Sequence, residues 1–406
     1  MNEPKLRFKA NDGSQFSDWE EKKLNEIVVR VTRKNKDNVT DIPLTISSVD
    51  GLIDQRNFFN KVVASKDMSG YYLLKNGEFA YNKSYSKGYD FGSIKRLDLY
   101  DEGALSTLYI CFALNKNENS DFYQKYFDSL SWYPELQKIC AEGARNHGLL
   151  NVPTNDFFQL KLCVPSSDKE QQKIAEFLST IDTVIEKQKE TVSAWEERKK
   201  GVMQKLFSQE VRFKADDGSN FPEWEEKKLG EVGDIVTGNT PSTKQNDYYG
   251  ECYLWVTPAD ITDSREVTST AKMLTELGYT VARHIPANSI LVTCIASIGK
   301  NAILRENGSC NQQINSITPY DEYSVEFVYY LICQNEKLLH ANAGTGGMEI
   351  LNKENFSKIK MYFPCFAEQQ KIADCLSSLD EVIEKQKATL SAWEELKKGL
   401  LQQMFV

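Results

Sequence analysis

The sequence is poor in the residues that most often bind metals. It has three histidines, His147, His284 and His340, and its nine cysteines are scattered without a CxxC pair. This pattern supports neither a zinc site nor a disulfide framework. We expect most of the cysteines to be small buried core residues, and the sequence predicts no metal ligands.

The common catalytic and cofactor-binding motifs are also missing. There is no GxxxxGK[ST] phosphate loop, no HExxH, no GxSxG elbow and no GxGxxG after a predicted strand. The AGTGGM segment at residues 343–348 is a single glycine-rich turn, and His147 has no cysteine or carboxylate at catalytic spacing. We therefore predict that the chain has no catalytic and no cofactor-binding residues. We expect it to bind a partner molecule and not to catalyse a reaction.

Long hydrophobic runs are absent as well. No run approaches 18 apolar residues, and the N-terminal sequence MNEPKLRFKANDG has no apolar region typical of a signal peptide. With 406 residues the chain can form two or three domains, each with its own core. We expect a soluble, cytoplasmic protein with no membrane segment.

Two passages occur twice, in the same order. Residues 7–26 return as 212–231 with 15 of 20 positions identical, and residues 170–207 return as 368–405 with 26 of 38 identical. The intervening inserts, taken as residues 28–165 and 233–364, show little mutual resemblance. A constant frame with two divergent inserts indicates that the frame sets geometry and the inserts set specificity.

Positive charge is scarce. The net charge is −9, the first insert has 17 Lys and Arg against 16 Asp and Glu, and the second has 10 against 14. If the protein binds DNA, attraction between its own surface and phosphate is weak. A partner protein would then supply many of the contacts that hold the DNA phosphates.

The long repeat predicts a helix in each copy, because its apolar residues recur at spacings of three and four. Each apolar stripe is too narrow to stand alone, so the two copies are expected to pack together. The connectivity favours an antiparallel pair with an insert at each end and a pseudo-two-fold axis. The predicted seam comprises Ile174, Leu178, Ile181, Ile185, Gln188, Val192, Trp195, Val202 and Leu206, with Ile372, Leu376, Leu379, Ile383, Gln386, Leu390, Trp393, Leu400 and Met404.

Polar residues interrupt this seam at equivalent places. Gln188 and Gln386 occupy one position, and Lys199 and Lys397 occupy another. Either the glutamines form a polar pair that fixes register, or they tolerate a partly wet seam.

Both inserts read as mixed α/β with short strands. Residues 72–84 alternate around Asn76-Gly77, which favours a hairpin, and residues 289–304 indicate two strands around residues 298–300. Residues 157–165 and 356–364 each predict a strand that ends at a proline before the long helix.

Several segments together suggest a family. The second insert region contains LGEVGDIVTGNTPSTKQNDYYGECYLWVTPADIT from residue 229, IPANSILVTCIASIGKNAIL from 285 and CNQQINSITP from 310, followed by EQQKIADCLSSLDEVIEKQK from 368. It closely resembles the specificity (S) subunits of type I restriction-modification systems, whose target-recognition domains begin with W…LG, carry a G-x-TPS turn and end in an EQxxIA helix. The first insert looks like another variety of this domain, with GEFAYNKS, GALSTLY and EQQKIA, but it lacks the TPS turn.

The resemblance implies an α+β fold with internal duplication. Two α/β target-recognition domains, residues 1–167 and 208–365, would be separated by two long antiparallel coiled-coil helices, residues 168–207 and 366–406. Such a subunit is not itself an enzyme. It would read a bipartite, asymmetric site on double-stranded DNA and dock two modification (methyltransferase) subunits, which methylate adenine, together with restriction/translocase subunits. S-adenosylmethionine, ATP and Mg are then expected on those partners, and no cofactor on this chain.

Candidate DNA-contacting residues are polar side chains that can donate to or accept from base edges. For each, an exposed loop side chain or a turn cap is the alternative. They are Lys83, Ser84, Tyr85, Arg145, Asn146 and His147 in the first insert, and Thr240, Ser242, Thr243, Lys244, Gln245, Lys300, Gln312, Gln313 and Thr345 in the second.

Two other functions fit the same pattern. One is a coiled-coil adaptor whose inserts bind proteins or glycans, which predicts no sequence-dependent affinity for DNA. The other is an enzyme with an unrecognised site.

Overall fold

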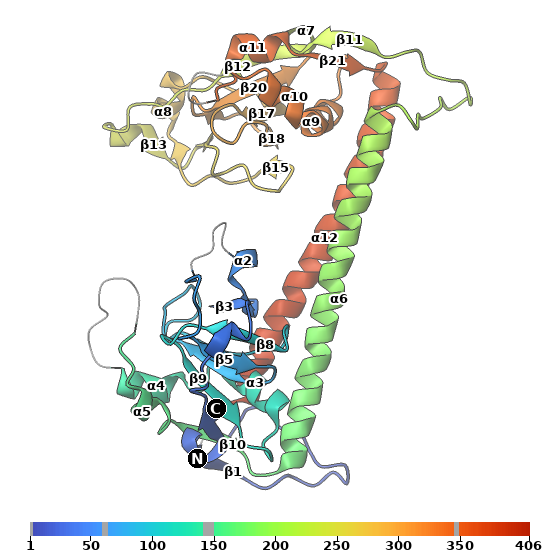
Figure 1. The fold of residues 1–406 in the computed structure, drawn as a ribbon. Coiled ribbons are helices and arrows are strands. Elements are labelled where there is room, and N and C mark those ends of the chain that lie inside the picture. The colour runs from blue at the N-terminus through green and yellow to red at the C-terminus, as the bar shows by residue number, and fades with distance from the viewer. Residues whose placement is uncertain (1–2, 59–63, 141–149, 345–348) are drawn as a thin grey trace. The chain divides into compact units, whose positions relative to one another are not determined.

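The computed structural model describes residues 3–58, 64–140, 150–344 and 349–406. The chain divides into two compact units, Met1–Lys189 with Ala388–Val406, and Glu190–Lys387. The two long helices, α6 (Asp168–Phe207) and α12 (Phe366–Met404), are each shared between the units (Figure 1). The sequence predicted that the two long helices begin at residues 168 and 366, and α6 and α12 begin there. The boundaries between the compact units lie elsewhere, near the midpoints of both helices.

The described residues of unit 1 form two four-stranded sheets and a two-stranded ribbon. The sheet orders are β2-β9-β6-β7, β4-β3-β8-β5 and β1-β10. The strands are β1 (Trp19–Lys23), β2 (Val28–Arg30), β3 (Pro43–Ser47), β4 (Gly51–Asp54), β5 (Tyr72–Lys75), β6 (Phe79–Asn82), β7 (Ser93–Arg96), β8 (Glu102–Leu105), β9 (Ile110–Leu114) and β10 (Lys161–Pro165). The short helices are α1 (Leu24–Ile27), α2 (Gln55–Phe58), α3 (Ser120–Ser129), α4 (Tyr133–Ile139) and α5 (Thr154–Phe157), with the 3-10 turn η1 (Lys36–Asn38).

An aromatic core fills unit 1. Phe79 stacks on Phe112 with ring centroids 5.5 Å apart, and Tyr81 stacks on Phe157 at 4.8 Å. The same cluster includes Leu401 and Met404 from the end of α12 and Phe405 directly after it, together with Ile174 and Leu178 from the start of α6. The start of one long helix and the end of the other therefore share the core of this unit.

Unit 2 has the same plan with different strands. Its sheets run β12-β20-β17-β18-β15, β13-β16-β14-β19 and β11-β21. The strands are β11 (Glu225–Lys228), β12 (Gly233–Thr237), β13 (Tyr249–Gly250), β14 (Tyr253–Val256), β15 (Glu266–Val267), β16 (Met273–Leu274), β17 (Ser289–Thr293), β18 (Asn301–Leu304), β19 (Ser309–Cys310), β20 (Ile314–Pro319) and β21 (Lys360–Phe363). The short helices are α7 (Leu229–Val232), α8 (Glu276–Val281), α9 (Val325–Gln334), α10 (Glu336–Ala341) and α11 (Lys353–Lys358), with the 3-10 turn η2 (Asn246–Tyr248).

The core of unit 2 takes the opposite ends of the long helices. Leu206 from the end of α6 lies in one buried cluster with Ile372 and Leu376 from the start of α12 and with Phe327 of α9. The residues predicted for the helix seam are all buried or partly buried. Gln188 and Gln386 are partly buried and fall in different units.

The duplicated sequences form the same strand pair, followed by the same capped short helix, in both units. In each, a strand of the short repeat pairs antiparallel with the strand that precedes the long helix: β1 (WEEKK) with β10, and β11 (EEKK) with β21. The backbone amides of Lys23 and Lys228 then donate to Glu26 and Glu231, at 3.0 and 2.9 Å, which caps α1 and α7.

The hairpin predicted around Asn76-Gly77 does not form. The turn itself is present, but its flanking strands do not pair with each other: β5 pairs with β8, whereas β6 pairs with β7 and β9. The Asn76 side chain donates to the carbonyls of Asp98 and Tyr100 at 3.1 Å, so the turn joins two sheets. By contrast, the two strands expected in residues 289–304 are confirmed as the antiparallel pair β17 and β18.

The strands before the long helices are shorter than predicted. Residues 353–358 form α11, whose first turn is capped by the Asn352 side chain accepting from the amide of Asn355 at 2.8 Å. Helix α5 likewise takes residues 154–157, directly after Pro153. An apolar alternation over so few residues did not distinguish one helical turn from a strand.

Fewer cysteines are core residues than expected. Cys111, Cys294 and Cys310 are buried, Cys252 is exposed, and the others are partly buried. Burial raises the pKa of the Cys111 thiol to about 12 and that of Cys294 to about 11. Among the described residues, no helix is both long and apolar enough to cross a membrane.

Candidate nucleic-acid interface

The TPS turn of unit 2 lies against the loop between β19 and β20. A Cβ at Gly238 would lie 2.1 Å from the carbonyl oxygen of Cys310, so only glycine allows this approach. The Gly238 amide donates to Ile314 and the Asn239 amide to Cys310. This backbone pairing brings together two segments that are 72 residues apart, Thr240 and Gln312.

Thr240 and Gln312 form an exposed polar pair. The Thr240 hydroxyl donates to Oε1 of Gln312 at 2.6 Å, and both side chains are exposed. Because a carbonyl oxygen has a second lone pair, the oriented amide can still accept one hydrogen bond and donate others. That combination matches the N6 and N7 edge of adenine in the major groove.

The segment at Arg283 and His284 is attached to the same turn. The backbone amide of Arg283 donates to the Asn239 side chain at 2.6 Å, and its guanidinium donates to the Thr237 carbonyl at 2.7 Å. Arg283 and His284 are both exposed. The sequence prediction missed these residues, although the pairing of a basic residue and a histidine in a loop could have drawn attention to them.

A stack of three rings supports His284. Tyr279 lies between Tyr253 and His284, with centroids 4.0 Å apart on each side and near-parallel planes. The Tyr253 hydroxyl hydrogen-bonds to Glu276, and Nε2 of His284 lies 2.9 Å from the Tyr279 carbonyl oxygen. The stack ends at His284, the chain neighbour of Arg283, whose amide is hydrogen-bonded to Asn239 next to Thr240.

The other candidates in unit 2 fall into two groups. Five candidates are exposed: Ser242, Thr243, Lys244, Gln245 and Lys300. Gln313 is partly buried, and its side chain accepts a hydrogen bond from Asn311 at 3.1 Å. It therefore stabilises the loop and is not part of the exposed loop surface. Thr345 lies outside the described residues.

The described candidates in unit 1 are less open. Nζ of Lys83 donates to the Val152 carbonyl at 3.0 Å, and burial together with Arg30 lowers the pKa of Lys83. Ser84 is partly buried and its amide donates to Asn82, whereas Tyr85 is 59% exposed. Arg145, Asn146 and His147 lie outside the described residues.

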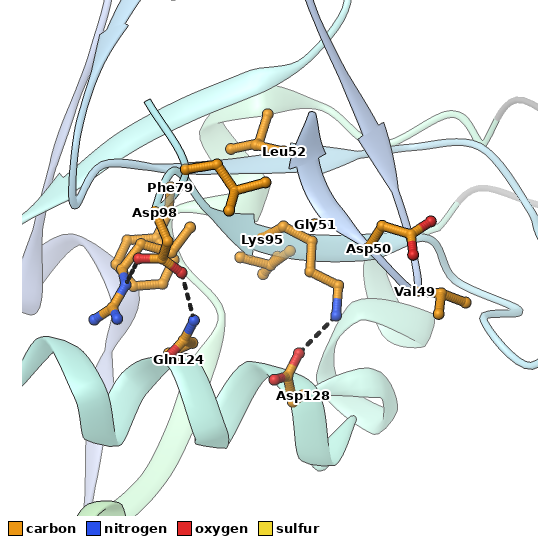
Figure 2. A pocket seen from close by; sticks show the side chains of 12 residues that line it. Val49, Asp50, Gly51, Leu52, Phe79, Lys95, Asp98, Gln124 and Asp128 are labelled. Carbon is orange, nitrogen blue, oxygen red and sulfur yellow. Dashed lines mark hydrogen bonds and ion pairs between the residues drawn. The ribbon is translucent and has the colours of Figure 1, made fainter. Parts of the chain in front are cut away.

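Unit 1 also has a pocket of about 200 Å³ that is lined by both apolar and charged residues (Figure 2). Within it, Lys95 donates to Asp128 at 2.7 Å, and Asp98 accepts from Arg96 at 2.6 Å and from Gln124 at 2.7 Å. Burial opposes the charge of Lys95, but Asp128 and Tyr89 outweigh it and raise the pKa of Lys95. Within the described part of the chain, no group of three or more His, Cys, Asp or Glu side chains could hold a metal ion.

Beneath these surfaces, the EQQK residues of the long repeat join each helix to its short repeat. Glu170 is fully buried and accepts from Arg7 through Nε at 3.0 Å and Nη2 at 2.9 Å, and Glu368 accepts in the same way from Arg212. The hydrogen bond with Glu170 raises the pKa of Arg7.

The next residues of the motif add two further links. The side-chain amides of Gln171 and Gln369 donate to the carbonyls of Pro165, the last residue of β10, and Pro364, which follows β21, at 3.0 and 2.9 Å. Lys173 and Lys371 donate to the carbonyls of Lys9 and Lys214 at 2.8 and 2.9 Å. These roles explain why the two repeats occur together in both copies.

Comparison with known proteins identifies the domain type. Residues 222–392 match the family model for the type I restriction modification DNA specificity domain. The chain is 32% identical over 211 residues to the type I restriction enzyme MjaIX specificity subunit of Methanocaldococcus jannaschii, an alignment that covers 49% of this chain and 48% of that protein. The chain thus spans about half the length of that relative.

Two further matches extend over nearly the whole chain. The putative type I restriction enzyme MjaX specificity subunit of M. jannaschii is 23% identical over 412 residues, covering 97% of this chain and 94% of that protein. The crystal structure of a type I restriction-modification system S subunit from M. genitalium has the same fold, with a TM-score of 0.55, 15% identity, and coverage of 100% of this chain and 99% of that chain. Residues 222–392 therefore form a type I restriction modification DNA specificity domain, and nearly the whole chain is similar to a putative type I restriction enzyme specificity subunit.

Proposed function

We propose that this protein is the sequence-reading subunit of a type I restriction-modification complex and reads a bipartite, asymmetric site on double-stranded DNA. The observation that carries the proposal is the repetition of one frame around two different inserts. The same Arg-Glu, Gln-carbonyl and Lys-carbonyl links recur in both units, whereas the exposed loop surfaces differ. Two different readers on one repeated frame suit a target with two unlike halves.

We further propose that α6 and α12 form one antiparallel coiled coil that separates the two readers. In unit 1, Nζ of Lys397 lies 2.7 Å from Oδ1 of Asp182, and in unit 2, Nζ of Lys199 lies 2.6 Å from Oδ1 of Asp380. Asp182 and Asp380 are equivalent positions of the repeat, as are Lys199 and Lys397. Such reciprocal pairing is what a pseudo-two-fold axis between antiparallel helices produces.

Base reading in the second half-site is assigned to the polar pair Thr240 and Gln312, with Arg283 and His284 beside it. Methylation of adenine, ATP hydrolysis and cleavage belong to the modification and restriction/translocase partners, which carry S-adenosylmethionine, ATP and Mg. Two modification subunits fit the duplicated frame, because equal sequences offer equal docking surfaces. The complex would act in the cytoplasm, where the DNA is.

The test is to express the chain with an adenine-methyltransferase modification subunit and to map methylated adenines across a genome. We expect a motif with two different specified halves and an unspecified gap. A continuous or palindromic motif would contradict two unlike readers. Absence of sequence-dependent methylation and binding with partners present would favour the adaptor function.

A further inference from the structure

Asp182 of α6 is a three-way junction in unit 1. One carboxylate oxygen, Oδ1, pairs with Lys397 of α12 at 2.7 Å, and the other accepts from Lys125 of α3. The Lys125 side chain is 7% exposed, and those of Asp182 and Lys397 are about 30% exposed or less. One carboxylate therefore connects both long helices to the recognition domain.

Asp380 of α12 makes the equivalent junction in unit 2. Its Oδ1 pairs with Lys199 of α6 at 2.6 Å, and its Oδ2 accepts from the Tyr330 hydroxyl of α9 at 2.6 Å. Arg265 lies 4.0 Å from Oδ2 and donates to Ser377, also on α12, at 2.9 Å. The Asp380 side chain is 17% exposed.

The two junctions share their helix residues and differ in their domain residues. The aspartate and the lysine come from the repeat, whereas the third partner comes from the insert: Lys125 in one unit, Tyr330 with Arg265 in the other. Helix α3 contacts β7 of its sheet, and α9 contacts β17, β18 and β20. Each junction is thus linked through one helix to the sheet that supports the reading loops.

We propose that Asp182 and Asp380 are positioning residues that fix the orientation of each recognition domain on the helix pair, and so define the accepted gap between the half-sites. This rests on the proposed function. A hydrogen-bonded carboxylate that joins its own helix to two other elements restrains rotation. Apolar packing alone restrains it weakly, because apolar contacts are non-directional. Different third partners allow the same helix position to hold unrelated inserts.

The test uses the complex with modification subunits and duplexes that carry both half-sites at the natural gap or with one base pair added or removed. The variants are Asp182→Asn and Asp380→Asn, which keep side-chain shape. Lys125→Gln removes only the domain contact and leaves the pair between Asp182 and Lys397. The control is Glu395→Gln, whose carboxylate lies 3.7 Å from Lys398 one turn along the same helix.

We expect the wild-type complex and the control to prefer the natural gap by about tenfold or more, equivalent to roughly 1.4 kcal/mol. In the three junction variants the preference should fall to about twofold, with binding to a single half-site unchanged. A preserved gap preference in all three, or equal loss of binding to half-sites and whole sites with reduced thermal stability, would overturn the proposal. Failure of the proposed function would be seen separately, as a continuous or palindromic motif in the wild-type methylation map.

Discussion

At the scale of single residues, the buried carboxylates of the EQQK motif are the most constrained groups in the frame. Glu170 and Glu368 have no exposed surface, and each is neutralised by one arginine from the short repeat. Removing the arginine would leave a buried charge without its partner, which is far more destabilising than losing a surface ion pair.

We therefore predict that Arg7→Met lowers the free energy of unfolding by about 3 kcal/mol. Arg33→Met is the matched control, because Arg33 pairs with Glu78 at 2.7 Å but is 39% exposed, and its loss should change stability by about 1 kcal/mol or less. Urea denaturation of both variants measures the difference. Equal effects would show that the Arg7 pair is no stronger than a surface contact.

The junction at Asp182 also predicts a pH dependence. Burial raises its pKa, but Lys125 and Lys397 outweigh burial and hold the pKa below the ordinary value of 3.8. A group with a depressed folded-state pKa contributes stability that is present above the unfolded-state pKa and is lost as pH falls through the folded-state value. The stability gap between wild type and Asp182→Asn should thus be constant from pH 7 to about 5 and close below pH 3.8. A gap that widens in acid would contradict this assignment.

Base reading by Gln312 is a third prediction at this scale. Gln312→Ala should relax the preference at one base pair of the second half-site by about tenfold, equivalent to roughly 1.4 kcal/mol. The first half-site is the internal control and should stay fully specified. Methylation mapping measures both, and an unchanged motif would remove Gln312 from the reading surface.

At the scale of elements, the long helices were largely predictable and the short elements were not. A heptad pattern repeated in two copies restricts a helix strongly, so the expected starts at residues 168 and 366 agree with α6 and α12. The turn at Asn76-Gly77 was recognised, but the partners of its strands depend on distant residues such as Asp98 and Tyr100. The seam position of Lys199 and Lys397 looked like an interruption, because their aspartate partners lie on the other helix and come close only after folding.

The same limit applies to the candidate site. Thr240 and Gln312 were both named from the sequence, but their hydrogen bond requires the close approach at Gly238. Arg283, His284 and the aromatic stack were missed, since stacking of Tyr253 on Tyr279 joins residues from β14 and α8. Lys83 was named as a candidate DNA-contacting residue, but its Nζ donates to the backbone carbonyl of Val152.

The helix pair predicts a simple length relation. Inserting seven residues after Lys189 and seven after Lys387 preserves the heptad phase and lengthens both helices by about 10 Å. We expect methylation to continue at a motif whose gap is about three base pairs longer. Four residues in one helix alone shift its phase and should abolish assembly. An unchanged gap with full activity in the seven-residue variant would show that the helices do not set the spacing.

At the scale of the whole molecule, the repeated frame and the inserts contribute different parts of the structure. The repeated residues form the strand pairs with β1 and β11, the long helices and the aspartate–lysine pairs in both units. The inserts supply the sheets and the exposed loops, and each insert makes its own contact with a shared aspartate. Under the proposed function, such a division would allow one half of the target to change without disturbing the other half.

The most direct test of this account is a chimaera in which residues 28–165 are replaced by the corresponding insert of another specificity subunit, followed by methylation mapping. The account predicts that one half of the motif changes to that of the donor, while the second half and the adenine methylated there stay the same. Alteration of both halves, or of neither, would contradict the claim that each insert reads its own half-site.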